Sequence, residues 1–176
     1  MAVLQIIRNL FVSTELVEPE IIVPAAPTSY EIHPLTEKNL KEVMRLNLRC
    51  FKKGENYNKH TFAFLMNDPT TLSYRVATPN EQIVGFIFVM TTNGIGHITT
   101  IGVAPEHRRR GLAEKMLLNI EEALKRRSIT TISLEVRVSN IGAQSLYRGL
   151  NYTIVQRLNN YYNNGEDGYL MVKSLF

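Results

Sequence analysis

Residues 101–116, IGVAPEHRRRGLAEKM, contain the change from strand to helix that is most informative about the architecture of this chain. An apolar strand ends here at Val103, and Pro105, which cannot donate a hydrogen bond to a strand partner, turns the chain. Three consecutive arginines follow, then Gly111 and the start of a helical pattern. We therefore expect a strand, a basic turn and a helix in direct succession.

The beginning of that helix is a predicted anion site. The first helical turn has backbone N–H groups without partners, and the helix dipole adds partial positive charge, so diphosphates commonly bind there. Gly111 permits close approach of the backbone, and Ala113 keeps that approach clear of a bulky side chain. The guanidinium groups of Arg108, Arg109 and Arg110 add forked donors for phosphate oxygens. Taken alone, the stretch also fits a solvated basic turn. It is neither a Walker loop nor a dinucleotide fingerprint, because the required lysine and glycines are missing.

Outward from this stretch, the apolar residues follow alternating strand and helix patterns. A helix is expected over 112–127, with a core face formed by Ala113, Met116, Leu117, Ile120 and Leu124. Strict alternation over 131–138 predicts a strand that carries Glu135 on its non-core face. Further helices are expected near 36–48, with Leu46 or Leu48 in the core, and near 59–66 and 140–150. Further strands are expected at 30–34, 72–77, 83–91, 96–103, 152–158 and 169–174. This order predicts one mixed α/β domain over residues 30–176.

Residues 1–29 differ from the rest of the chain and are interpreted as an appended N-terminal segment. The segment is moderately apolar up to Phe11 and then carries three prolines. Arg8 is its one basic residue, and three glutamates follow, which argues against a transit peptide. A short helix packed on the domain and a disordered segment both remain open.

The composition is typical of a single globular domain with a hydrophobic core: 176 residues, 44% hydrophobic and 20% charged. No apolar run approaches the roughly 20 residues that span a bilayer. The single Cys50 cannot form an intramolecular disulfide and fits a reducing compartment, so we expect a cytoplasmic protein. We expect no metal. The net charge of +4 is compatible with a ribosome or nucleic acid as partner. The arginines lack interleaved aromatic residues, however, so specific nucleic-acid binding is not expected.

A second group of residues lies downstream, in Leu134-Glu135-Val136-Arg137-Val138-Ser139-Asn140, followed by Ala143, Leu146-Tyr147 and Asn151-Tyr152. Each of them alone has an ordinary interpretation. A strand glutamate is usually solvated, an asparagine at a helix start is usually a cap, and a helical tyrosine beside leucine is usually core. Only the combination points to a function.

Taken together, these residues resemble the GNAT superfamily of N-acetyltransferases. Arg108-x-x-Gly111-x-Ala113 is similar to the acetyl-CoA signature of that superfamily, Gln or Arg followed by x-x-Gly-x-Gly or Ala. Asn140-x-x-Ala143-x-x-Leu146-Tyr147 is similar to its second motif. The segments 96–99, 134–140, 150–152 and 161–167, with Glu55-Asn56-Tyr57, resemble the branch that acetylates protein N-termini, which includes the RimI-type ribosomal-protein-alanine acetyltransferases. Asn151 and Lys53-Gly54 depart from some members of the branch, which affects the expected substrate preference.

The resemblance implies a fold and a donor site. The fold is a mixed, mostly antiparallel sheet flanked by helices, in which two central strands splay apart to hold acetyl-CoA. The diphosphate of CoA is expected on the amides of Arg109, Arg110, Gly111, Leu112, Ala113 and Glu114, and Asn140 is expected near the CoA. Backbone contacts to the pantetheine and acetyl group are expected from Ile101, Gly102 and Val103, with the Val103 N–H close to the developing oxyanion.

The resemblance also implies an acceptor site and a reaction, the acetylation of a protein or peptide N-terminal α-amino group. Glu135 is the expected base and Tyr147 the expected acid for the CoA thiolate, with His97 or Glu55 as alternative bases. The acceptor is expected to enter between Glu55–Tyr57 and Tyr161–Asp167, where Tyr57, Tyr161 and Tyr162 would line its path. Expected partners are a ribosomal protein or a ribosome-anchoring subunit. Acetylation of a lysine side chain or a small amine, and a non-catalytic CoA-binding regulatory module, are the alternatives.

Overall fold

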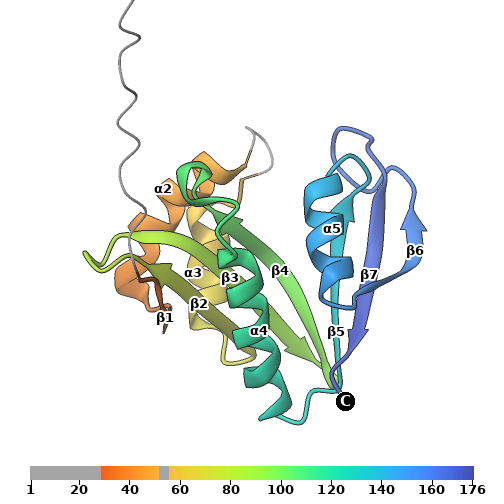
Figure 1. Ribbon diagram of the computed structural model, residues 1–176, viewed down its shortest axis with the longest axis horizontal. Coiled ribbons are helices and arrows are strands. Elements are labelled where there is room, and N and C mark those ends of the chain that lie inside the picture. Colours follow the sequence, from red (N-terminus) through yellow and green to blue (C-terminus); the bar gives the residue numbers. More distant parts are fainter. Residues whose placement is uncertain (1–28, 52–55) are drawn as a thin grey trace, which may run out of the picture.

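The computed structural model describes residues 29–51 and 56–176. The expected appended segment, apart from Ser29, lies outside the described residues, and so does Glu55. Figure 1 shows the arrangement of helices and strands. The structure consists of the following elements: β1 (Glu31–Pro34), the 3-10 turn η1 (Glu37–Asn39), α2 (Leu40–Cys50), α3 (Lys59–Asn67), β2 (Thr71–Ala77), β3 (Ile83–Thr92), β4 (Ile95–Val103), η2 (Pro105–His107), α4 (Leu112–Lys125), β5 (Thr131–Arg137), α5 (Ile141–Gly149), β6 (Thr153–Leu158) and β7 (Gly168–Ser174).

The seven strands form one sheet in the order β1-β2-β3-β4-β5-β7-β6. All neighbouring strands are antiparallel except β4 and β5, which are parallel. Strand β7 lies between β5 and β6 and so completes the second half of the sheet. The expectation of a mixed, mostly antiparallel sheet flanked by helices is confirmed. Within residues 29–51 and 56–176, no helix has the length and apolarity that crossing a membrane requires.

Strands β4 and β5 pair over only three residues. Ile95–His97 of β4 pairs with Thr131–Ser133 of β5, and beyond that point the two strands diverge (Figure 1). Up to Val103, β4 continues to pair with β3, while β5 pairs with β7 along its whole length. Each strand therefore keeps one neighbour and loses the other. The expected splay is thus present, and the backbone groups along its inner edges are not used by the β4–β5 ladder.

Helix α4 and strand β5 follow the periodicities seen in the sequence. Helix α4 buries Met116, Leu117, Ile120 and Leu124 completely, and it packs on β2, β3 and β4. Ala113, expected on the same face, is only half-buried because it lies in the first turn, at the helix end. Strand β5 buries Ile132, Leu134 and Val136, while the residues between them face the other side. The period of two therefore directs Ser133, Glu135 and Arg137 to one face.

The amphipathic pattern of the first helix left two candidates for the core, and the structure separates them. The helix begins with a 3-10 turn over Glu37–Asn39 and continues as α2 from Leu40. Leu46 is buried, whereas the side chain of Leu48 is 66% exposed. Helices α2 and α3 cover one face of the first half of the sheet, and α4 covers the other (Figure 1).

A buried polar cluster joins α4 to the second half of the sheet. The carboxylate of Glu121, only 4% exposed, accepts a hydrogen bond of 3.0 Å from the Tyr152 hydroxyl and a charge-assisted one of 2.5 Å from Lys173 Nζ. The Lys173 ammonium also lies 5.5 Å from the centre of the Tyr152 ring. Lys173 pairs with Ile132 in the ladder of β5 and β7. The cluster therefore connects the two halves close to the point where β4 and β5 still pair.

Replacing Lys173 with methionine should destabilise the protein strongly, because it leaves the Glu121 carboxylate buried without a compensating cation. Loss of one partner of a buried ion pair typically costs about 3 kcal/mol or more of unfolding free energy. Urea unfolding checks this value. The matched control is Lys125→Met, which breaks the surface pair with Glu122 at 2.9 Å and should cost less than about 1 kcal/mol. Equal, small losses in both variants would contradict the importance of the buried pair.

Candidate active site

The loop after β4 prepares the start of α4 for an anion. Arg109 and Gly111 both have positive φ angles, of 60° and 73°. Gly111 is the N-cap of α4. Within residues 29–51 and 56–176, no side chain caps this end, and a Gly111 Cβ would meet no atom within 4 Å outside its chain neighbours and the backbone of α4 itself. The N–H groups of the first turn therefore carry no side-chain cap, and the binding of an anion by them stays a prediction.

The three arginines of this loop have different environments. Arg108 does not direct its fork at the open end of the helix. Instead, its Nε donates to the Val103 carbonyl at 3.0 Å and its guanidinium donates to the Cys50 carbonyl at 3.2 Å. The loop folds back on the end of β4 and brings the guanidinium to these carbonyls, which the sequence pattern did not indicate. Arg110 donates to the Tyr30 hydroxyl at 2.9 Å, and the side chain of Arg109 is exposed.

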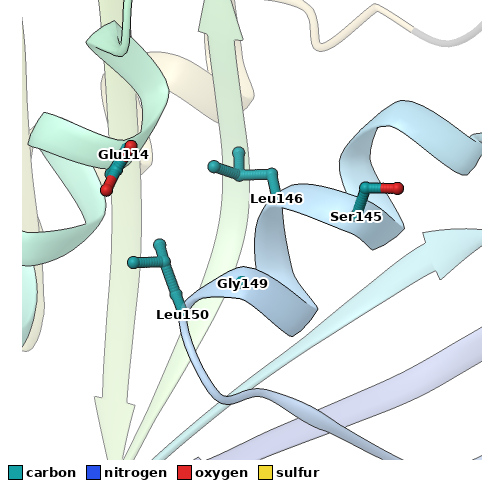
Figure 2. A pocket seen from close by; sticks show the side chains of 5 residues that line it. All are labelled: Glu114, Ser145, Leu146, Gly149 and Leu150. Atoms are coloured by element: carbon teal, nitrogen blue, oxygen red, sulfur yellow. The ribbon is translucent and has the colours of Figure 1, made fainter.

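A pocket of about 240 Å³ lies between α4 and α5 (Figure 2). Glu114 contributes from the first turn of α4, and Leu146 and Leu150 project toward it from α5 and the residue that follows. Ser145 and Gly149 complete the lining. The pocket thus has one apolar wall and lies beside the first turn of α4.

The strand end that leads to the loop has little room for side chains. A Cβ at Gly102 would approach the Phe86 ring to 3.0 Å and the Cys50 sulfur to 3.1 Å. Ile101 and Val103, on either side, are half-buried. These three residues lie on β4 beyond the last residue that pairs with β5. They therefore form the part of β4 along which a ligand could contact the backbone.

Glu135 and His97 meet across the splay, although they come from different strands. Oε2 of Glu135 lies 3.3 Å from Nε2 of His97, and Nδ1 of His97 lies 3.3 Å from the Ser133 hydroxyl. His97 and Ser133 form the last residue pair of the β4–β5 ladder. Glu135 follows Ser133 by two residues, so it lies on the same face just inside the opening. The two candidate bases are therefore one paired unit.

Two tyrosines, from opposite sides, flank this pair. Tyr57, which precedes α3, donates from its hydroxyl to the Thr99 carbonyl of β4 at 3.1 Å. Burial raises the pKa of Tyr57, and the negative charge of Glu135 raises it further. Burial also raises the pKa of Tyr161, with smaller contributions from the charge of Glu135 and a hydrogen bond to it. The structure thus brings Tyr57 and Tyr161 close to Glu135, and their contact with an acceptor stays a prediction.

The loop between β6 and β7 is held by a residue that the sequence did not single out. The Arg137 guanidinium lies 3.8 Å from the centre of the Tyr162 ring and 2.8 Å from a carboxylate oxygen of Glu166. The other oxygen of Glu166 accepts from the Ser139 N–H at 2.9 Å. Arg137 shares the face of Ser133 and Glu135, and this alternation was the signal available in the sequence. The pKa of Tyr162 is raised to about 12, and burial of its side chain is the main cause.

Tyr147 is more deeply buried than the three tyrosines of the acceptor side, Tyr57, Tyr161 and Tyr162. It is 5% exposed, on α5, and its ring contacts that of Tyr152 with centres 5.6 Å apart. Burial raises the pKa of Tyr147 well above its usual range, with a smaller contribution from Tyr162. The hydroxyl therefore keeps its proton at neutral pH. Asn140 caps α5 by accepting from the Ala143 N–H at 3.2 Å.

Comparison with known proteins identifies the family of this chain. The model of the acetyltransferase (GNAT) family matches residues 40–152. An N-alpha-acetyltransferase of Saccharolobus solfataricus is 34% identical over 134 residues, which are 69% of this chain and 80% of that protein. One from Sulfolobus acidocaldarius is 30% identical over 160 residues, 84% of this chain and 94% of that protein. The crystal structure of the ribosomal-protein-S18-alanine N-acetyltransferase from Escherichia coli superposes with a TM-score of 0.76 and 25% identity, covering 84% of this chain and 94% of that one.

The free energy of unfolding at acidic pH should depend on the protonation of Glu166. Hydrogen bonds to Ser139, followed by Arg137, lower the pKa of Glu166 from 4.5 to about 2. A lowered pKa means that the carboxylate stabilises the folded state fully above pH 4.5 and progressively less as the pH falls toward 2. The difference in unfolding free energy between wild type and Glu166→Gln should therefore shrink over that range in urea titrations. A difference that does not change with pH would contradict this assignment.

Proposed function

Because the chain belongs to the acetyltransferase (GNAT) family, we propose that it transfers the acetyl group of acetyl-CoA to the free α-amino group of a protein or peptide N-terminus. The observation that carries the proposal is the Glu135–His97 pair, which lies just inside the splay between Tyr57 and Tyr161. A base at this position faces both the strand edge of the donor side and the two loops of the acceptor side. The similarity to two proteins named N-alpha-acetyltransferases supports the same reaction.

The donor would bind along the β4 side of the splay. The uncapped N–H groups from Arg109 to Glu114 suit a diphosphate, since they combine backbone donors with the positive end of a helix dipole. The apolar wall formed by Leu146 and Leu150 suits the pantetheine chain. Ile101, Gly102 and Val103 offer backbone groups to the acetyl end, and the Val103 N–H is the candidate oxyanion donor. Asn140 is assigned near the CoA, with its side-chain oxygen retained as the cap of α5.

The reaction needs one proton removed and one supplied. A free α-amino group has a pKa near 8, against about 10.4 for lysine, so an N-terminus needs little assistance to be neutral. Glu135, with His97 as its partner, accepts the amine proton directly or through water. The amine nitrogen forms the amide bond to the carbonyl carbon, and the carbon–sulfur bond breaks. Tyr147 is protonated at neutral pH before the reaction, and it supplies this proton to the departing thiolate.

The acceptor would enter between the two tyrosine-bearing loops. Tyr57 is fixed by its bond to Thr99, and Tyr162 is fixed under Arg137, so both walls are ordered before the peptide arrives. Tyr161 contacts Glu135 from the second wall. The proposed natural acceptors are ribosomal or other nascent protein N-termini in the cytoplasm, with a ribosome-anchoring subunit as a candidate partner. The net charge of +4 is compatible with that surrounding.

A peptide panel should separate N-terminal acetylation from the alternatives. The protein is incubated with acetyl-CoA and short peptides beginning Ala, Ser, Met-Leu or Met-Glu, and with an N-terminally blocked peptide that contains lysine. We expect thiol release, and a mass increase at the α-amine, only with free N-termini. Acetylation of the blocked peptide alone would indicate a lysine acetyltransferase. Binding of CoA without transfer to any acceptor, including polyamines, would indicate a regulatory module.

Replacing Glu135 with glutamine should lower turnover by about 100-fold or more, because loss of a general base typically has an effect of 10²–10⁴. The Kd for CoA should stay unchanged, since Glu135 lies on the acceptor side. Steady-state kinetics and calorimetric titration with CoA measure the two quantities. The matched control is Glu122→Gln, the same change on the exposed side of α4. Wild-type turnover in the Glu135 variant would remove Glu135 from the role of base.

A further inference from the structure

Tyr30 lies immediately before β1 and makes three contacts with the loop at the start of α4. Its hydroxyl lies 3.0 Å from Nδ1 of His107 and accepts a hydrogen bond of 2.9 Å from Arg110. Its backbone carbonyl accepts a hydrogen bond of 2.7 Å from Lys115 Nζ. Tyr30 thus contacts a residue before the three arginines (His107), the last of the arginines (Arg110) and a residue after them (Lys115). It stands ten positions ahead of the segment that matches the family.

The direction of these hydrogen bonds follows from the groups involved. A guanidinium only donates, so the Tyr30 oxygen accepts from Arg110 and its own proton is free to be donated to His107. That arrangement needs a neutral imidazole with Nδ1 unprotonated. Burial lowers the pKa of His107; Glu106 opposes this, and Arg110 and Arg49 reinforce it. The Tyr30 and His107 rings also meet edge to face, with centres 5.9 Å apart.

The loop depends on such external contacts for its shape. Two of its residues have positive φ angles, and its glycine N-cap supplies no side-chain hydrogen bond to the helix. On one side, Arg108 ties the loop to the carbonyls of Val103 and Cys50. Tyr30 ties the other side through Arg110. Fixing a loop in advance lowers the entropic cost of ligand binding, so these anchors affect affinity without contacting the ligand.

We propose that Tyr30 is a positioning residue that holds the loop of Arg108–Gly111 in the conformation that binds the CoA diphosphate. The inference rests on the proposed function, because it assumes that this loop binds CoA. A competing interpretation predicts the opposite effect of the Tyr30 hydroxyl on the affinity for CoA. If the Tyr30 hydroxyl withholds the Arg110 guanidinium from a phosphate, loss of the hydroxyl will strengthen CoA binding.

The test is Tyr30→Phe, which keeps the ring against His107 and the carbonyl for Lys115 but removes both hydroxyl hydrogen bonds. Calorimetric titration should show a Kd for CoA that is raised about 3- to 10-fold, the order expected for hydrogen bonds of this kind. Turnover at saturating acetyl-CoA and the KM for the peptide should not change, which a general loss of structure would not produce. Tyr74→Phe, which removes a hydroxyl from β2, is the matched control and should leave the Kd unchanged.

Two further measurements fix the interpretation. Dephospho-CoA retains the diphosphate and lacks the 3′-phosphate, so Tyr30→Phe should weaken its binding by the same factor; a loss confined to CoA would overturn the proposal. In a His107→Phe background the effect of Tyr30→Phe should shrink, because the two residues act as one unit. Unchanged or tighter CoA binding by Tyr30→Phe overturns the inference alone. Failure of the wild-type protein to bind CoA would instead overturn the proposed function.

Discussion

The divergence of β4 and β5 determines where every other part of the candidate site lies. Three paired residues per strand hold the two halves of the sheet together, and His97 with Ser133 is the last pair before the strands separate. Backbone groups that a complete ladder would consume are left for a ligand. The same separation places the start of α4 on one side and the tyrosine-bearing loop of residues 161–167 on the other. The proposed donor and acceptor sites therefore lie at one edge of the sheet because two strands stop pairing there.

Glu135 and Tyr147 differ in their surroundings as well as in their positions. On the face that holds Glu135, the carboxylate lies 3.3 Å from an imidazole nitrogen of His97 and keeps partial access to solvent. On α5, Tyr147 is almost completely buried, which favours the protonated phenol. The two groups that the proposed reaction uses as base and acid therefore lie in surroundings of different polarity. The buried cluster of Glu121, Tyr152 and Lys173 supports this arrangement from behind, since the Tyr152 ring contacts Tyr147.

Periodicity in the sequence was sufficient to predict most of the fold. The alternation of 131–138 correctly placed Glu135 away from the core, and the helical spacing of Met116 to Leu124 correctly gave the buried face of α4. The choice between Leu46 and Leu48 stayed open because both fit one amphipathic stripe, and only packing against the sheet decides it. The expectation that the acceptor enters between the segments of Tyr57 and Tyr161 came from a family resemblance, and the position of both tyrosines near Glu135 was found only in the structure. The partners of Arg108, Arg137 and Tyr30 could not be predicted, because each depends on where a turn directs a long side chain relative to distant backbone or aromatic groups.

The position of Arg108 changes how the first letter of the acetyl-CoA signature is understood. Its side chain donates to the carbonyls of Val103 and Cys50, and so acts as a brace between two peptide segments. The family signature accepts glutamine there as well as arginine, and both side chains end in a planar group with N–H donors. A lysine has the charge but a single tetrahedral head, which would not reproduce a planar brace. What this loop uses at position 108 is therefore a planar set of N–H donors that reaches two carbonyls, and the positive charge of the side chain is not needed for those two hydrogen bonds.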